Sequence, residues 1–272
     1  MDVQKLQKTA QAIVADGKGI LAADESGGTI KKRFDSIGVE SNEEARRAYR
    51  DLLFTTEGAE EYIGGVILFD ETIRQSSADG TPFPKLLESK GIVPGIKVDT
   101  GAKPLALAEG ETVTEGLDGL RERLNEYREL GARFAKWRAV ITIGNDIPSE
   151  YCIWTNAHAL ARYAALCQEA SIVPIVEPEV LMDGDHTIER SFEVTSRTLH
   201  AVFTELRDQR VQPEGILLKP NMVLPGYECP QQATDEEIAH ETVRCFLRHV
   251  PAAVPGVSFS PAASRRRRRP AG

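Results

Sequence analysis

One lysine of this sequence stands where a primary amine can act as a nucleophile. Lys219 follows the apolar residues 215–218 (GILL) and precedes Pro220. Removal of a primary amine from water disfavours its ammonium form, so free amine becomes available to attack a carbonyl carbon. The alternative is a lysine that reaches from the end of a strand into solvent. Charged residues elsewhere in the sequence favour the interpretation of Lys219 as a nucleophile over that of a solvent-exposed lysine.

Charged residues also mark the ends of other short apolar runs. They are Asp24, Lys97, Lys136, Arg138, Glu177 and Glu179. Because strand side chains alternate between two faces, Lys136 and Arg138 share one face, as do Glu177 and Glu179. Buried charges are costly unless they are paired, so a mixed set of cations and carboxylates indicates a functional site more than structural ion pairs. The set offers an acid, a base and an amine.

Seven apolar runs alternate with longer segments of helical periodicity, which is typical of βαβ units around a parallel sheet. The runs are residues 19–24, 64–69, 95–99, 134–140, 173–179, 215–221 and 254–259. The segments with helical spacing are 42–56, 116–130, 149–170, 186–209 and 235–249. Near-continuous apolar strands predict a sheet that is buried on both faces, and a closed ring of eight strands would complete it. In such a barrel the carboxyl ends of the strands share one mouth, where the charged residues would converge.

The predicted fold class is therefore α/β, a TIM (β/α)8-type barrel over residues 1–259. The length of 272 residues suits one such barrel, which takes roughly 250 residues. The eighth strand is missing from the pattern, because the sequence after Phe259 reads Ser-Pro-Ala-Ala-Ser, five arginines and Pro-Ala-Gly. We expect an incomplete barrel without strand 8 and the C-terminal helices, followed by a disordered basic tail at residues 260–272.

Composition narrows the class of protein. A hydrophobic content of 41% with 27% charged residues predicts a soluble globular protein. Five of the 33 Lys and Arg residues lie in the run 265–269, so the remainder has 28 against 41 acidic residues, a net charge of −13. This charge disfavours binding of nucleic acid by the body of the protein. No signal peptide or span of membrane length is present, which predicts a cytoplasmic protein without a membrane partner.

The cysteines predict no disulfide framework. Cys152, Cys167, Cys229 and Cys245 form no C-x-x-C pair and stand in apolar or helical surroundings. This pattern is expected of reduced thiols in a compartment like the cytosol.

Five segments resemble, in their order along the chain, the motifs of the class I fructose-1,6-bisphosphate aldolases. They are GILAADES (19–26), GGVILF (64–69), FAKWR (134–138), IVEPE (175–179) and LLKPNM (217–222). The resemblance runs from about residue 5 to about residue 259. It implies a TIM barrel, usually a homotetramer, that works in glycolysis and gluconeogenesis.

The resemblance implies a lyase that forms a Schiff base. Lys219 would add to the ketone carbon of fructose 1,6-bisphosphate, and cleavage would release glyceraldehyde 3-phosphate and then dihydroxyacetone phosphate. Lys136 matches the family's second active-site lysine, which helps to keep the Lys219 amine uncharged. Glu177 matches the general acid/base, and Asp24 matches the carboxylate that binds substrate hydroxyls and assists cleavage.

Further residues match supporting positions of the family. Glu179 and Arg138 fit a shell that holds the catalytic groups. Hydroxyls and cations suit a phosphate dianion, and the predicted substrate-binding residues are Ser26, Thr29, Arg33, Lys97 and Arg138. Thr29 replaces what is usually a serine in animal members, which keeps the hydroxyl.

No cofactor is implied beyond the covalent imine. A metal-dependent aldolase would need a cluster of imidazoles around zinc. The five histidines form no H-x-x-H or H-x-x-x-H pair, which predicts surface or helix-packing roles for them.

The sequence departs from the family pattern after the seventh predicted strand. The family continues with a Ser-Gly-Gly phosphate loop, further helices and an eighth strand that bears a phosphate-binding arginine. We expect impaired activity without these parts, and exposed strand edges. The alternative hypothesis is an inactive aldolase fragment with at most a binding role. The sequence leaves two questions open: whether the homotetramer persists, and whether fructose 1,6-bisphosphate is preferred to fructose 1-phosphate.

Overall fold

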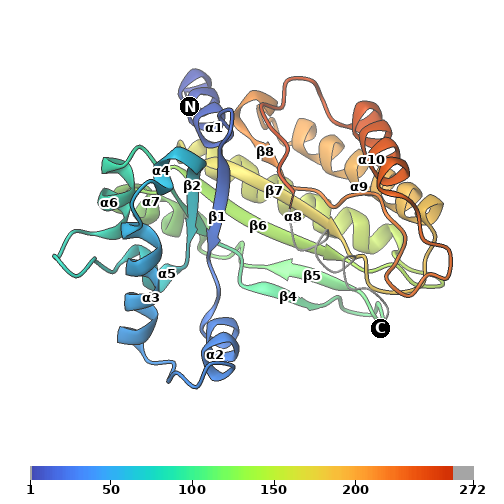
Figure 1. Ribbon diagram of the computed structural model, residues 1–272. Coiled ribbons are helices and arrows are strands. Elements are labelled where there is room, and N and C mark those ends of the chain that lie inside the picture. The colour runs from blue at the N-terminus through green and yellow to red at the C-terminus, as the bar shows by residue number, and fades with distance from the viewer. Residues whose placement is uncertain (1, 260–272) are drawn as a thin grey trace. The chain divides into compact units, whose positions relative to one another are not determined.

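The structure, a computed structural model, describes residues 2–259 (Figure 1). Within these residues the helices are α1 (Val3–Ile13), α2 (Gly27–Asp35), α3 (Glu43–Thr55), α4 (Ala59–Tyr62), α5 (Asp70–Ile73), α6 (Phe83–Ser89), α7 (Leu120–Leu130), α8 (Glu150–Glu169), α9 (Ile188–Asp208) and α10 (Asp235–His249). The strands are β1 (Gly19–Ala23), β2 (Ile63–Leu68), β3 (Val93–Lys97), β4 (Gly101–Pro104), β5 (Thr112–Glu115), β6 (Phe134–Ile141), β7 (Val173–Val180) and β8 (Leu217–Leu218). The predicted tail at residues 260–272 lies outside the described residues.

The main sheet has the strand order β1-β2-β3-β6-β7-β8, and β4 and β5 form a separate antiparallel pair. The pairs β1 with β2, β2 with β3, β3 with β6 and β7 with β8 are parallel. Helices stand between successive strands of the main sheet, so each parallel neighbour is reached by a crossover. The predicted α/β class with a partial TIM-type barrel is confirmed.

The chain divides into two compact units. Within the described residues, unit 1 comprises residues 2–98, 119–136 and 166–174. Unit 2 comprises residues 99–118, 137–165 and 175–259. Strands β6 and β7 contribute their first residues to unit 1 and the remainder to unit 2. The organisation of residues 1–259 as one domain stays a prediction.

In unit 1, α1 covers β2 with one apolar face. Its buried residues Leu6, Ala10 and Ile13 recur at the spacing of one helical stripe. Asp2 caps the helix, because its carboxylate accepts a hydrogen bond from the Lys5 amide at 3.1 Å. The helix is therefore fixed at its first turn and buried along one side.

Gly64 in β2 lies so close to α1 that only glycine fits. A Cβ at this position would stand 2.2 Å from the backbone oxygen of Ile13. Gly64→Ala is therefore expected to lower the free energy of unfolding by about 1–3 kcal/mol, since backbone atoms must shift to relieve the overlap. Urea unfolding followed by circular dichroism measures this change. Gly19→Ala in β1 is the control, because a Cβ there meets nothing within 4 Å; equal losses in both variants would contradict the packing reason.

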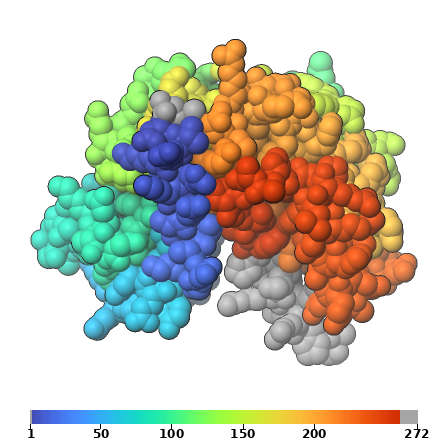
Figure 2. Space-filling model, turned by 90° about the horizontal axis from the view of Figure 1, so that it is seen from above, coloured from blue at the N-terminus to red at the C-terminus, as the bar shows by residue number. Residues whose placement is uncertain are grey.

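In unit 2, α9 and α10 lie side by side (Figures 1 and 2). The Thr187 hydroxyl caps α9 by accepting from the Arg190 amide at 3.3 Å. A capping box begins α10, in which the Thr234 hydroxyl accepts from the Glu237 amide at 3.2 Å and the Glu237 carboxylate accepts from the Thr234 amide at 2.7 Å. The predicted helix over 235–249, with its acidic first turn, has the same bounds in the structure.

Two of the predicted strands differ in the structure. The run 215–221 forms only the two-residue strand β8, after a 3-10 turn at Pro213–Gly215. The prediction of a strand over 254–259 is wrong, because this segment makes only an isolated parallel bridge between Val257 and Leu218. Pro255 lacks an amide hydrogen, and the two-residue β8 offers too few partners for a longer ladder.

His186, in the loop before α9, is 8% exposed. Burial lowers the pKa of its imidazole, and the neighbouring Asp185 opposes this effect only in part. The unfolded chain therefore binds a proton more readily than the folded chain does. The contribution of the neutral His186 to the free energy of unfolding is fully present at pH values above the pKa of histidine in the unfolded chain, about 6.5. This contribution is lost as the pH falls below that value.

We expect the urea midpoint to fall between about pH 7.5 and about pH 5.5, and to fall less in His186→Gln. Unfolding curves at the two pH values measure this difference. His240→Gln is the control, because the His240 side chain is 73% exposed. An unchanged pH dependence in His186→Gln would contradict the assignment.

All four cysteines are buried free thiols, as the sequence predicts. Burial raises the pKa of the Cys152 thiol to about 12, with a further contribution from Glu111. This thiol therefore stays protonated and unreactive near neutral pH. Separately, the described part of the chain has no helix that combines the length and the apolar character needed to cross a membrane.

Candidate active site

In unit 2, Lys219 directly after β8 meets Glu177 in the second half of β7. Ile175 pairs with Leu217 and Val176 with Leu218, so continuation of this register sets Glu177 opposite Lys219. The Lys219 amide donates to the Val176 carbonyl at 2.8 Å, which fixes the backbone just after β8. The Lys219 Nζ donates to Glu177 Oε1. The two side chains that the sequence predicts as nucleophile and general acid/base are thus in direct contact.

The two side chains of this contact differ in their exposure to solvent. The Glu177 side chain is 2% exposed, whereas the Lys219 side chain is 22% exposed. A buried carboxylate needs a cationic or hydrogen-bonding partner, and the lysine supplies one. The amine can still be reached by a small molecule. A carboxylic acid held against an amine can move protons to and from groups that react at the nitrogen.

Arg138 and Glu179 form a second ion pair in unit 2. Both Nε and Nη2 of Arg138 contact Glu179 Oε2. The Arg138 side chain is 42% exposed, so it can also meet an anion from solvent. Its amide lies 3.4 Å from Asp99 Oδ2, and its carbonyl accepts from the Thr114 hydroxyl at 2.7 Å. The arginine is anchored through its backbone while its guanidinium stays partly accessible.

In unit 1, Asp24 follows β1 and pairs with Lys136 of β6. The Lys136 Nζ donates to Asp24 Oδ2 at 3.0 Å, and the side chains are 12% and 10% exposed. In the sheet order β1 and β6 are three positions apart, which is about 14 Å in a flat sheet. The contact therefore requires the sheet of unit 1 to curve around this face.

Lys97 lies beside Lys136 on this curved sheet. The two residues are register partners on β3 and β6, so their side chains leave the sheet on the same face. Cations from two neighbouring strands and the Asp24 carboxylate thus gather at one end of unit 1.

The loop after β1 and the start of α2 carry the predicted hydroxyl and guanidinium groups. The Ser26 and Thr29 hydroxyls lie 3.2 Å apart, and both residues are exposed. Arg33 Nη1 donates to Glu25 Oε1, and the Arg33 side chain is 58% exposed. These groups are accessible to an anion from solvent.

Two residues that hold these groups, Glu25 and Asn221, have no role in the prediction from the sequence. Glu25 stands inside a quoted motif, yet the motif does not reveal its ion pairs with Arg33 and Arg50. Asn221 is 7% exposed and accepts from the Val180 amide at 3.2 Å while it donates to the Thr195 hydroxyl at 2.9 Å. Asn221 thereby fixes the loop that follows Lys219. The available signal in the sequence was an asparagine two positions after the lysine, within the segment LLKPNM.

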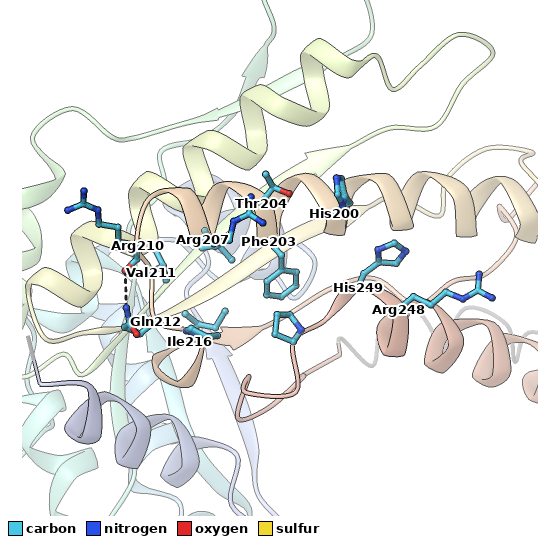
Figure 3. A pocket seen from close by; sticks show the side chains of 13 residues that line it. His200, Phe203, Thr204, Arg207, Arg210, Val211, Gln212, Ile216, Arg248 and His249 are labelled. Atoms are coloured by element: carbon cyan, nitrogen blue, oxygen red, sulfur yellow. Dashed lines mark hydrogen bonds between the residues drawn. The ribbon is translucent and has the colours of Figure 1, made fainter.

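A separate pocket lies in unit 2 between the C-terminal part of α9 and the end of α10 (Figure 3). Its volume is about 530 Å³, and its lining includes the cationic residues Arg207, Arg210 and Arg248 together with His200 and His249. Burial, His200 and Arg248 lower the pKa of His249. None of the predicted site residues lines this pocket, and among residues 2–259 its lining contains neither a lysine nor a carboxylate. It is therefore distinct from the candidate active site.

The sequence predicts no metal site, and this stays a prediction. Across residues 2–259, no group of three or more His, Cys, Asp and Glu side chains is arranged to hold a metal ion.

Comparisons with known proteins agree on one family. A family model described as fructose-bisphosphate aldolase class-I matches residues 5–267. A probable fructose-bisphosphate aldolase class 1 of Xylella fastidiosa is 61% identical over 259 residues, which cover 95% of this chain and 78% of that relative. Fructose-bisphosphate aldolase 1 of Toxoplasma gondii is 57% identical over 94% of this chain and 71% of its own length.

A solved structure shows the same likeness in three dimensions. Fructose-bisphosphate aldolase of Plasmodium falciparum, crystallised with TRAP and a small-molecule inhibitor, aligns with a TM-score of 0.92 at 50% identity. The alignment covers 94% of this chain and 75% of that one.

Proposed function

Because the chain belongs to the class I fructose-bisphosphate aldolase family and is an enzyme of that family, we propose that it reversibly cleaves fructose 1,6-bisphosphate through an imine on Lys219. The products are dihydroxyacetone phosphate and glyceraldehyde 3-phosphate. The observation that carries this proposal is the accessible Lys219 amine held against the buried Glu177 carboxylate. An amine next to a proton-transferring group is what imine chemistry requires.

The first half of the reaction forms the imine. The Lys219 nitrogen lone pair attacks the ketone carbon, a C–N bond forms as the carbonyl π bond breaks, and the carbonyl oxygen takes up a proton from solvent on the way to a carbinolamine. Glu177 accepts a proton from the nitrogen and donates one to the departing hydroxyl, which leaves as water. The resulting iminium cation withdraws electrons from the adjacent carbon.

The second half breaks the carbon–carbon bond. The hydroxyl on the second carbon from the iminium carbon loses its proton and becomes the aldehyde carbonyl. The bond between this carbon and the carbon next to the iminium breaks, its electron pair forms the enamine double bond, and the π pair of the iminium moves to the nitrogen. Glyceraldehyde 3-phosphate leaves, and an enamine remains on Lys219. Protonation of the enamine carbon and hydrolysis of the imine release dihydroxyacetone phosphate and restore the amine.

We assign supporting roles to the other predicted residues. Asp24 binds substrate hydroxyls and assists bond cleavage, and Lys136, which donates to Asp24, serves as the second active-site lysine. Glu179 orients Arg138, in keeping with their ion pair. Anion binding is assigned to Ser26, Thr29, Arg33, Lys97 and Arg138, whose hydroxyl and cationic groups suit phosphate.

Borohydride trapping tests this function. Incubation of the soluble protein with dihydroxyacetone phosphate and sodium borohydride reduces any imine to a stable secondary amine. Peptide mass spectrometry is expected to find the adduct on Lys219. Cleavage of fructose 1,6-bisphosphate, followed in a coupled assay, is expected to persist in the presence of a chelator. A folded protein that forms no adduct and shows no cleavage would support the alternative of an inactive aldolase with at most a binding role.

A further inference from the structure

Arg50 occupies a position of α3 where an apolar residue is expected. Arg50 and Phe54, one helical turn apart, are the buried residues of this helix. The Arg50 side chain is 3% exposed. Arginine is almost never so deeply buried unless it is paired, so its partner explains its presence.

That partner is Glu25, in the loop between β1 and α2. Arg50 Nη2 lies 2.7 Å from Glu25 Oε2, and the Glu25 side chain is 8% exposed. The other oxygen of the same carboxylate accepts from Arg33. Glu25 therefore stands between two guanidinium groups, one buried on α3 and one 58% exposed on α2.

The position of Glu25 in the sequence connects this ion pair to the predicted anion-binding residues. Glu25 is flanked by Asp24 and Ser26, and the loop leads into α2, which carries Arg33. An exposed arginine with several rotatable bonds has many conformations, and each fixed contact reduces their number. The contact with Glu25 fixes Arg33 Nη1, while Arg50 fixes Glu25 from the buried side.

A neighbouring ion pair of the same type provides the comparison. Arg46, one turn before Arg50 on α3, donates to both oxygens of Glu71 at 2.8 and 2.7 Å. These side chains are 22% and 31% exposed, and the Arg46 guanidinium donates to the Ser41 carbonyl and to Glu71 rather than to residues 24–33. Arg46 and Arg50 line one cavity of about 240 Å³. They therefore share a location but differ in their ion-pair partners, which are Glu71 and Glu25.

We propose that Arg50 is a positioning residue for anion binding: through the Glu25 carboxylate it orients the Arg33 guanidinium toward the phosphate of the substrate. The inference rests on the proposed function, in which Arg33 is an anion-binding group. Arg50 itself contacts no substrate. Its removal leaves a buried carboxylate with one mobile partner, and Arg33 loses its fixed orientation.

Kinetics of Arg50→Met test the proposal. We expect KM for fructose 1,6-bisphosphate to rise about fivefold to tenfold, with kcat changed by less than about twofold, because only binding of the phosphate is weakened. Arg50→Lys keeps the positive charge and one donor, so we expect its change in log KM to be about half of the change in Arg50→Met. Arg46→Met is the matched control, and its KM is expected to stay within about twofold of the unaltered protein.

A double-mutant cycle distinguishes positioning from a structural role. If Arg50 acts through Arg33, then Arg33→Ala combined with Arg50→Met is expected to have a KM within about twofold of Arg33→Ala alone. Independent effects would multiply instead, and this result would overturn the proposal. A lowered thermal midpoint in Arg50→Met with KM unchanged would also overturn it, because the arginine would then serve stability only.

Equilibrium binding of hexitol 1,6-bisphosphate separates this inference from the proposed reaction. This compound has no ketone and cannot form an imine, so calorimetric Kd values report anion binding alone. We expect Kd to weaken about fivefold to tenfold in Arg50→Met and to stay unchanged in Arg46→Met. If these Kd changes are found but borohydride traps no adduct, the proposed reaction is contradicted and the positioning role of Arg50 is kept. A Kd that is equal in all variants, or no binding by the unaltered protein, would overturn the positioning role. If Arg50→Met does not fold, Arg50→Lys decides by the same measurements.

Discussion

Lys219→Arg is expected to lower kcat/KM for fructose 1,6-bisphosphate by about 10⁴-fold or more, as removal of a covalent nucleophile does in other enzymes. The replacement keeps a positive charge beside Glu177 and a side chain of similar length. A guanidinium stays protonated near neutral pH and has no lone pair to attack a ketone. The change therefore removes the imine while the ion pair with Glu177 can persist. A coupled assay of cleavage and borohydride trapping with dihydroxyacetone phosphate measure both effects.

The matched control for this loss is Lys31→Arg. Lys31 is 61% exposed and pairs with Asp35 on the surface of α2. The same chemical replacement there is expected to leave cleavage and trapping unchanged. Cleavage that survives in Lys219→Arg would rule out an imine on this lysine as the route of the reaction. Thermal unfolding of both variants shows whether a loss of activity is a loss of folded protein.

Glu177→Gln is expected to lower kcat by about 10²- to 10⁴-fold, the usual contribution of a general acid/base. Glutamine keeps the shape of the side chain and an oxygen that can accept from Lys219, but it cannot carry a proton to the departing hydroxyl. Dehydration of the carbinolamine should then become slow. Single-turnover trapping with dihydroxyacetone phosphate is expected to show slow adduct formation on Lys219.

The control for this second prediction is Glu193→Gln on α9. Glu193 is 54% exposed and pairs with Arg190 and Arg197. Its replacement removes a carboxylate from an ion pair of unit 2 without touching the candidate active site. Equal losses in Glu193→Gln and Glu177→Gln would show that the effect arises from charge or stability. A fast rate of trapping in Glu177→Gln would also contradict the assigned role.

The family and the main strands were predictable because they depend on local pattern. Five motifs in order identified the class I aldolases, and the comparisons confirm this identification. The alternation of charged and apolar residues in 134–138 is reproduced in β6, where Lys136 and Arg138 are half-buried and Trp137 is buried. Period-two alternation follows from backbone geometry and needs no knowledge of distant residues.

Other elements escaped prediction because their local pattern was too short or because a neighbouring strand decided the outcome. The hairpin of β4 and β5 has strands of four residues each, too short for a periodic signal. The run 254–259 looks like a strand by its apolar residues, yet Pro255 and the short β8 leave it with a single bridge. A strand exists only when a neighbour supplies hydrogen bonds, and the sequence of one segment does not state the length of its neighbour.

The sequence by itself determined which residue types stand at the ends of which strands, and therefore that an amine, carboxylates and cations were available for chemistry. Only the tertiary structure decided their pairing. The contact of Asp24 with Lys136 joins residues 112 positions apart and depends on the curvature of the sheet in unit 1. The burial of Arg50 against Glu25 depends on how α3 packs beside the loop after β1. The reason is physical: the periodicity of a strand or helix is set within a few residues, whereas the free energy of a buried charge is set by whichever distant side chain folding brings within reach of it.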